Sequence, residues 1–564
     1  MLPAKPDGSN GGDNYVYPVD AFPPISAFEV STEFPALILP VRRTHELRKK
    51  LKSIMLNRPR LSVVAELTHS DLDHDDEEKG FLSSDKKLKL SQDNRKMYRK
   101  IVLDPQKAGL KNSKDCNSEI HHDLKMLLEE EPQSFRLGSH TIVLSYQDWT
   151  AEEVLGRLLL PEGVEEVPSA FEAVGHLAHV NLRDGLLPYK YLVGKVLLDK
   201  NSPRIRTVVN KLGSIDNKYR TFGMEVIAGD ASSKGDKNGE SWSDVLVKEE
   251  GCEYRLDFRK VYWNSRLGGE HRRLVKLIRK DASARAQKKR LESSNGTNTS
   301  DKGASETPKK SLVVADLMAG IGPFAIPLTA RTNEAPKSDR GDTKKKKNKN
   351  STTARVPPLP VVVHANDLNP SSYEFLVVNA KRNKCDFIAN GDSMDSHSKY
   401  TKHKLHAYNM DARSFCHLLQ DRKIFPDHCI MNLPATAIEF LDAFRGYPRA
   451  TVGEASVENK DDLPRIHVHC FAPRDVQSAK SELWKRVEAS LGCPLDEIGD
   501  EVVIHPVRDV APNKNMYCVS FKLPAAVSLL PRIQIDVKQE DEELKEETKK
   551  EVVEPDPKRR KTNE

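Results

Sequence analysis

Short apolar runs and amphipathic stretches alternate along the second half of the chain. Strand-like runs at 311–316 and 360–367 are each followed by a segment whose apolar residues have helical spacing. Two more apolar runs end at Asp411 and at Pro434, and a last group of strand-like runs lies between residues 465 and 523. This alternation predicts βαβ units and an α/β, Rossmann-like domain with a doubly wound, mostly parallel sheet.

The first half of the chain predicts smaller α+β domains. Residues 62–67 and 140–146 have strand-like patterns, and 150–160 form an amphipathic helix with Thr150 as its N-cap. Residues 165–262 read as a second α+β unit, with a helix near PYKYLVGKVLLDK and a strand at TVVNKLG.

Polar, low-complexity stretches separate these blocks. Only 38% of the residues are hydrophobic and 30% are charged, which indicates folded domains diluted by solvated segments. The expected organisation is a disordered 1–24, an N-terminal α+β domain at 25–160, a middle α+β domain at 165–265, an α/β domain at 266–530 with disordered insertions 281–310 and 333–355, and a charged disordered tail at 537–564.

Composition excludes several classes of protein. Lys and Arg total 89 against 83 Asp and Glu, so any nucleic-acid surface must be local. No apolar run approaches the roughly 20 residues that cross a bilayer. The eight cysteines form no CxxC pair, which argues against a zinc site and a disulfide framework. The N-terminus has no apolar core and carries acids, so we expect neither a signal peptide nor a transit peptide.

A glycine turn follows the strand 311–316. That strand ends in Asp316, and the chain turns through Gly320 and Gly322 into a helix expected to begin at Pro323. Glycines let a backbone approach a ligand, and the helix start presents free N–H groups. The turn also fits the dinucleotide pattern GxGxxG/A, so a nucleoside cofactor is indicated without its identity.

Two further acids end later strands. Asp367 is placed to accept hydrogen bonds from the ribose hydroxyls of such a cofactor, with the insertion at 333–355 accounting for its distance from Asp316. Asp411 is either a helix cap or a contact at the adenine edge.

The run HCIMNLP ends in Asn432-Leu433-Pro434 before an amphipathic helix. This tripeptide resembles the (D/N)PP(Y/F)-type motif of amino-methyltransferases, although it lacks the second proline. The order of acid, glycine turn, acid, acid and Asn-x-Pro therefore favours a class I AdoMet methyltransferase over a dehydrogenase.

The block 258–274 (FRKVYWNSRLGGEHRRL) gathers aromatic and charged residues directly before the α/β domain. The order VYWNSRLGGEH, DLMAGIGPFAIP, NDLNP, NLP resembles the tRNA (guanine-N1) methyltransferases of the archaeal–eukaryotic type. The resemblance covers roughly 165–525, and more weakly 35–160.

The resemblance implies methyl transfer from AdoMet to N1 of guanosine 37 of tRNA, next to the anticodon, which supports reading-frame maintenance. N1 carries a proton at neutral pH, so a base is needed, and Glu270 occupies the family's position for it. Arg220 matches the arginine that stabilises charge at O6, although Lys218, two positions earlier, could supply the same charge. Tyr262 would hold the base, and Asn432 would align cofactor and guanine. The displacement needs no metal.

The resemblance also assigns binding residues. The cofactor set is His271, Asp316, Gly320, Gly322, Asp367, Leu368, Asp411, Ala412, Asn432 and Pro434. The RNA-binding set is Arg204, Arg206, Lys211, Arg266, Arg272 and Arg273, with Lys276, Arg279 and Lys280 as further candidates. We expect a monomer that acts on tRNA with G at position 37, with no membrane partner.

Three other functions remain open from the sequence. They are a different RNA or protein amino-methyltransferase, a catalytically silent tRNA-binding protein, and an NAD-dependent enzyme. The family resemblance implies cytoplasm, nucleus and mitochondrial matrix, and the basic cluster PDPKRRK at 555–561 fits a short nuclear signal.

Overall fold

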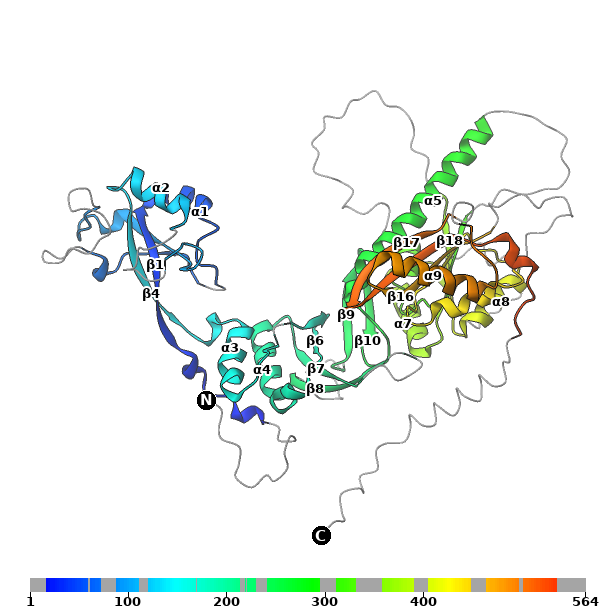
Figure 1. Cartoon of the computed structure of the whole chain (residues 1–564), viewed down its shortest axis with the longest axis horizontal. Coiled ribbons are helices and arrows are strands. Elements are labelled where there is room, and N and C mark those ends of the chain that lie inside the picture. The colour runs from blue at the N-terminus through cyan, green and yellow to red at the C-terminus, as the bar shows by residue number, and fades with distance from the viewer. Residues whose placement is uncertain are drawn as a thin grey trace, which may run out of the picture. The chain divides into compact units, whose positions relative to one another are not determined.

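The computed structural model describes residues 17–58, 61–72, 88–110, 120–168, 170–213, 219, 221–229, 241–294, 311–330, 358–389, 404–447, 463–496 and 501–534. The chain divides into two compact units. The first comprises Met1–Glu172, Ala178–Lys211 and Glu225–Ala231, and the second comprises Ala173–Leu177, Leu212–Met224 and Ser232–Glu564. Figure 1 colours the chain from the first unit in blue and cyan to the second in green to red.

The first unit contains an antiparallel sheet in the order β2-β3-β1-β4. Its strands are β1 (Val30–Pro40), β2 (Val64–Ala65), β3 (Tyr98–Val102) and β4 (Arg136–Leu144). Helices α1 (Thr44–Lys50) and α2 (His122–Glu130) bury Leu47, Leu124 and Leu127 in one core with the inward side chains of β1. The period-2 pattern around 140–146 thus correctly predicted a strand.

Two more helices and a second sheet follow. Helix α3 (Ala151–Leu159) begins as expected at Thr150, whose hydroxyl accepts from Glu153 N in a capping box. Helix α4 (Lys190–Asn201) lies where PYKYLVGKVLLDK predicts it. The sheet, in the order β5-β6-β7-β8, has strands β5 (Glu172–Val174), β6 (Leu177–Val180), β7 (Thr207–Leu212) and β8 (Gly223–Gly229).

The second unit contains an eight-stranded sheet in the order β13-β14-β12-β11-β15-β16-β18-β17. The strands are β11 (Leu312–Asp316), β12 (Val361–Asn366), β13 (Phe387–Ile388), β14 (Leu405–Tyr408), β15 (His428–Met431), β16 (Arg465–Pro473), β17 (Val503–Ala511) and β18 (Lys514–Lys522). The pairs from β13 to β16 are parallel, and β18 and β17 add antiparallel pairs. The predicted doubly wound, mostly parallel sheet is confirmed.

Helices and a hairpin complete this unit. The helices are α5 (Gly268–Ser294), α6 (Ala325–Thr329), α7 (Pro370–Arg382), α8 (Ala412–Asp421) and α9 (Val476–Leu491), and the hairpin joins β9 (Asp244–Glu249) to β10 (Cys252–Asp257). Helices α8 and α9 and the 3-10 helix Ala437–Phe444 share one core cluster against the sheet. Among the described residues, no helix is long and apolar enough to cross a membrane.

Several sequence expectations are corrected here. Helix α5 continues to Ser294, so 281–294 is not part of a disordered insertion. Its buried positions include the small residues Ala282 and Ala286, which give a weaker helical pattern than large apolar residues would. Residues 17–24 are likewise ordered, because Tyr17 is buried and stacks on Tyr189 with ring centroids 5.0 Å apart. The remaining segments expected to be disordered (1–16, 295–310, 333–355 and 537–564) lie outside the described residues.

Two boundaries also differ. Helix α6 begins at Ala325 rather than Pro323, because the loop makes a further turn in which Gly322 N donates to Ala319 O. The segment 165–265, expected to be one middle domain, is divided between the two compact units.

Candidate active site

A pocket of about 220 Å³ opens at the carboxyl ends of β11, β12, β14 and β15. In a doubly wound sheet this edge, where the strand order reverses beside β11, is where ligands bind. The sequence-predicted residues that line it are Tyr262, His271, Gly320, Asp367, Leu368, Asp411, Ala412, Asn432 and Pro434. The sequence motifs therefore converge on one cavity inside the second unit.

Gly320 and Gly322 shape the floor of the pocket. Both have positive φ, 54° and 99°. A Cβ on Gly322 would lie 2.7 Å from Ile326 and 2.8 Å from Leu376, so any other residue would have to displace these side chains in addition to adopting a strained φ. The N–H of Gly320 donates to Asp367 Oδ2 at 2.7 Å, and this bond ties the glycine turn to the end of β12.

Asp316 and Asp367 are acids with raised pKa values. Burial raises the pKa of Asp367 to about 6. Burial, and then the nearby Asp367, raise the pKa of Asp316 to about 8. Within the described part of the chain no side-chain donor reaches either oxygen of Asp316, and the buried Oδ1 of Asn432 also lacks a hydrogen-bond partner. Buried acceptors of this kind indicate donors supplied by a ligand.

These features fit AdoMet. Asn432, Asp367 and Asp411 line the pocket and offer oxygens to the ammonium, hydroxyl and amine donors of AdoMet. Asp316 is fully buried and is not itself a lining residue, but its oxygens without partners are also suited to an ammonium group. Asp411 also caps α8, because its Oδ1 accepts from Arg413 N at 2.8 Å and from Ser414 N at 3.1 Å. Both interpretations of Asp411 left open by the sequence are thus compatible.

His271 and Tyr262 also line the pocket. His271 Nδ1 lies 2.6 Å from Glu249 Oε1, and its ring packs edge-on against Phe324 with centroids 4.9 Å apart. Tyr262 is 40% exposed, and its hydroxyl accepts from Asn264 Nδ2 at 3.2 Å. An exposed aromatic ring at the pocket is suited to stacking on a nucleobase.

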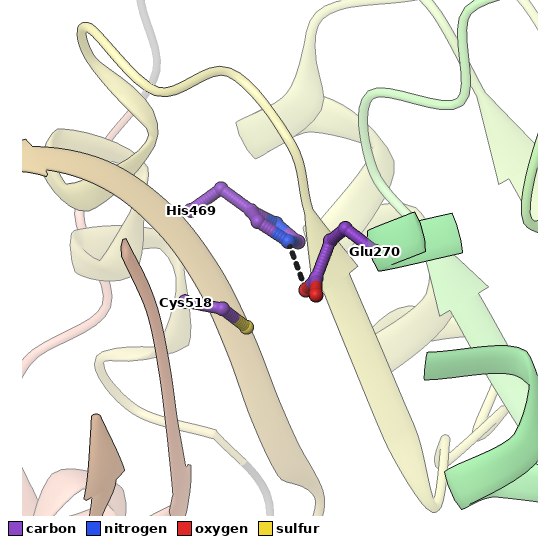
Figure 2. Close-up of side chains that lie close together, drawn as sticks. All are labelled: Glu270, His469 and Cys518. Carbon is purple, nitrogen blue, oxygen red and sulfur yellow. Dashed lines mark hydrogen bonds and ion pairs between the residues drawn. The ribbon is translucent and has the colours of Figure 1, made fainter. Parts of the chain in front are cut away.

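Glu270 directly precedes His271 but lies outside the pocket lining. It is 5% exposed and bonds Arg273 through both oxygens, at 2.6 and 2.7 Å. His469 Nε2 lies 2.8 Å from Glu270 Oε1, and Figure 2 shows the two side chains facing each other with Cys518 beside them. Burial alone would raise the pKa of Glu270, but hydrogen bonds from Arg273 and His469 outweigh it and lower this pKa to about 2.

His469 is the reciprocal partner. Burial alone would lower its pKa, but Cys518 and Glu270 raise it to about 10, so the imidazole is a buried cation. Donor atoms of Glu270, His469 and Cys518 lie within 4.8 Å of one another, a spacing that a metal ion could bridge. We assign an ion-pair cluster instead, because His469 and Arg273 already neutralise the carboxylate.

The RNA-binding candidates are divided between the two compact units. Arg204, Arg206 and Lys211 belong to the first unit, and Arg266, Arg272 and Arg273 belong to the second. Arg272 pairs with Glu250, and Arg273 pairs with Glu270. The half-buried Arg279 donates to Pro327 O at 2.5 Å, which gives it a structural role that the sequence did not predict. Arg220 lies outside the described residues.

Several site residues were missed from the sequence. They are Tyr219, Trp263, Asn264, Phe440, Phe471, Arg508, Val510 and Met516 in the pocket wall, and His469 and Cys518 behind it. One signal was available, because His467 and His469 stand at alternate positions of an otherwise apolar strand and therefore face the same side of the sheet.

The strand order, counted along the chain from β11 without the short β13, is 3-2-1-4-5-7-6 with the seventh strand antiparallel. Together with the glycine turn and the strand-end acids, this order defines a class I AdoMet-dependent methyltransferase, with AdoMet as methyl donor.

Comparison with known proteins identifies the family. Residues 151–232 match the family described as TYW2 N-terminal domain. The chain is 42% identical over 528 residues to tRNA (guanine(37)-N(1))-methyltransferase 1 of Phaeodactylum tricornutum, covering 93% of each chain, and 34% identical to the tRNA (guanine(37)-N(1))-methyltransferase of Batrachochytrium dendrobatidis, covering 89% of this chain and 88% of the other. The chain belongs to the tRNA (guanine(37)-N(1))-methyltransferase family. Trm5b from Pyrococcus abyssi is a similar solved structure, with 17% identity, a TM-score of 0.46, and coverage of 87% of this chain and 99% of that chain.

Proposed function

We propose that this chain transfers the methyl group of AdoMet to N1 of guanosine 37 of tRNA. The observation that carries the proposal is a pocket lined both by the cofactor residues Gly320, Asp367 and Asn432 and by the exposed ring of Tyr262. Curated relatives across nearly the full length carry this activity in their names. The substrate is tRNA, and the restriction to G at position 37 is the part that needs measurement.

Each residue has a defined task in this proposal. AdoMet, when bound, supplies a methyl group made electrophilic by its positive sulfur. Asp316, Asn432 and Asp367 would hold it through their acceptor oxygens. Tyr262 stacks on the guanine, and Asn432 orients it from the end of β15.

The chain's own residues must also manage the N1 proton. Glu270 is the proposed base, since it directly precedes His271 in the pocket wall and is ionised at neutral pH. Arg220 is proposed to place its guanidinium at O6; its neighbour Tyr219 lines the pocket.

The test uses labelled AdoMet with unmodified tRNA transcripts that carry G or A at position 37. We expect N1-methylguanosine with the G transcript alone, and loss of most of the label with Glu270→Gln. Label on another nucleotide would discard the proposed substrate. AdoMet and tRNA binding without any transfer would make the chain a silent binding protein.

We further propose that the chain acts as a monomer and works in cytoplasm, nucleus and mitochondrial matrix. Light scattering of the purified chain at micromolar concentration, with and without tRNA, tests the first point. Imaging of a tagged full-length chain, with and without residues 555–561, tests the second.

A further inference from the structure

The two cations that hold Glu270 differ in their freedom to move. His469 is fully buried between β16 and its neighbours, and its imidazole contacts Glu270 Oε1. The Arg273 side chain is 26% exposed, and its Nε holds Glu270 Oε2 at 2.6 Å. Two weaker neighbours complete the surroundings: Cys518 from β18 lies beside His469, and His505 Nε2 from β17 lies 4.0 Å from Glu270 Oε2. Of the two strong partners, only Arg273 can leave without moving the core.

Arg273 also lines a second cavity, of about 930 Å³, beside helix α5. Six cationic side chains and three carboxylates surround this cavity. Asp281 and Asp427 pair with Arg285, and Glu501 pairs with Arg465. Lys280 and Lys288 add positive charge to the same walls, so the cavity has a cationic surplus that suits an anion.

A base held by two cations is poorly matched to its task. General-base catalysis is most effective when the pKa of the base is near the working pH, and the two ion pairs keep that of Glu270 far below it. Removing one nearby cation raises the pKa of a carboxylate by about 1–3 units. The arrangement in this structure is therefore a resting state of Glu270.

We propose that Arg273 is a releasable counter-ion of Glu270: a backbone phosphate of the bound RNA draws its guanidinium into the cavity beside α5, and Glu270, still held by His469, then accepts the N1 proton. The proton passes from N1 to Oε2, and the electron pair of the broken N–H bond stays on N1. Arg273 acts here as a positioning residue, and RNA binding switches the base on. This inference rests on the proposed function.

The test is a double-mutant cycle on RNA affinity, measured by fluorescence anisotropy without AdoMet in phosphate-free buffer. If Arg273 exchanges partners, Glu270→Gln removes the competing carboxylate and tightens tRNA binding by about three- to tenfold. The gain disappears in an Arg273→Gln background. Lys280→Gln is the matched control: it lines the same cavity without touching Glu270, so the gain persists in its background. Arg273→Gln also lowers the slope of log affinity against log salt by about 1.

Opposite results overturn the proposal. The first is a tRNA affinity that Glu270→Gln leaves unchanged. The second is an increase in tRNA affinity by Glu270→Gln that persists in the Arg273→Gln background. A gain seen only after inorganic phosphate is added would show that a free anion, not RNA, takes the guanidinium, and would also overturn it. The cycle needs no methyl transfer, so failure of the proposed guanosine specificity leaves its result interpretable.

A second measurement covers the case in which Glu270→Gln does not fold. Single-turnover rates at saturating RNA report the complex, and rates at low RNA report the free enzyme. Each set of rates is measured as a function of pH, and the rate falls on the acidic side where the base becomes protonated. In the wild type, release of Arg273 places this acidic fall at saturating RNA about 1–3 pH units above the acidic fall at low RNA. In Arg273→Gln the acidic falls at saturating and at low RNA lie at the same pH, whereas in Arg273→Lys they remain separated. Acidic falls that coincide in the wild type, or that stay apart in Arg273→Gln, contradict the proposal.

Discussion

Two groups of buried carboxylates in the second unit differ in how their charge is balanced. Asp316 and Asp367, at the cofactor end of the sheet, have raised pKa values of about 8 and 6 and form no ion pair among the described residues, although the His469 cation partly offsets the rise at Asp316. Glu270, on the other side of the pocket wall, has two cationic partners and a pKa of about 2. The first group needs positive charge from a ligand for balance. Glu270 is already balanced by cations of the chain and must lose one of them to act as a base.

The same chemical change should therefore have opposite effects in the two groups. Glu270→Gln leaves His469 and Arg273 without a counter-charge and should lower the free energy of unfolding by about 3–5 kcal/mol. Asp316→Asn removes a carboxylate that is costly to bury and should raise it. Chemical denaturation at pH 7 measures both, and equal signs for the two variants would break the comparison.

The pH dependence sharpens this contrast. The folded pKa of Asp316 lies above its unfolded value, so between about pH 4 and 8 the unfolded state binds fewer protons and wild-type stability falls as pH rises. The advantage of Asp316→Asn should grow through this window. Glu270 shows the reverse, because its pKa is lower in the folded state than in the unfolded state. Its contribution to folding stability is present above the unfolded pKa and is lost as pH falls toward the folded pKa of about 2.

A smaller effect concerns the glycine turn that carries the cofactor side. Gly322→Ala introduces both a positive-φ penalty and a clash with Ile326 and Leu376, and should cost about 3 kcal/mol or more. Gly320→Ala is the matched control, because its φ is also positive but nothing lies within 4 Å of the added Cβ, so about 1–2 kcal/mol is expected. Thermal unfolding without ligand compares them, and equal losses would contradict the packing explanation.

The sequence predicted the cofactor side far better than the base cluster. Asp316 ends β11 and Gly320 follows it, Asp367 follows β12, and Asn432 follows β15. The topology of the sheet then brings these three strand ends to one edge. The alternation of strand and helix patterns is enough to predict such a site, because each of its motifs is a short continuous segment.

The base cluster has no local signature. His469 lies 199 residues from Glu270 along the chain, and Cys518 reaches it only because β18 pairs antiparallel with β16. The charged surroundings of Glu270 were visible in GEHRR, but the sequence cannot say which of these charges turn inward. The same lack of long-range information led to the wrong assignment of 281–294, in which Ala282 and Ala286 are buried.

Ligand binding offers the next test. If the ammonium group of AdoMet pairs with ionised Asp316, binding must displace the proton that this residue holds at neutral pH. Affinity should then rise by up to about tenfold per pH unit between pH 6 and 8, with proton release seen by calorimetry in buffers of different ionisation enthalpy. Asp316→Asn should bind more weakly and lose most of this dependence, and a wild-type affinity independent of pH would show that Asp316 is not the partner.

The smallest expected effect separates the ring of Tyr262 from its hydroxyl. Stacking on a base depends on the ring, so Tyr262→Ala should reduce kcat/KM for tRNA by about 10- to 100-fold. Tyr262→Phe keeps the ring and loses only a solvent-exposed hydrogen bond to Asn264. It should change kcat/KM by less than about threefold. AdoMet affinity should be unchanged in both, because the acids proposed to hold it are not altered. A large loss in Tyr262→Phe would instead give the hydroxyl a role in the chemistry, and the division between cofactor residues and base residues would have to include it.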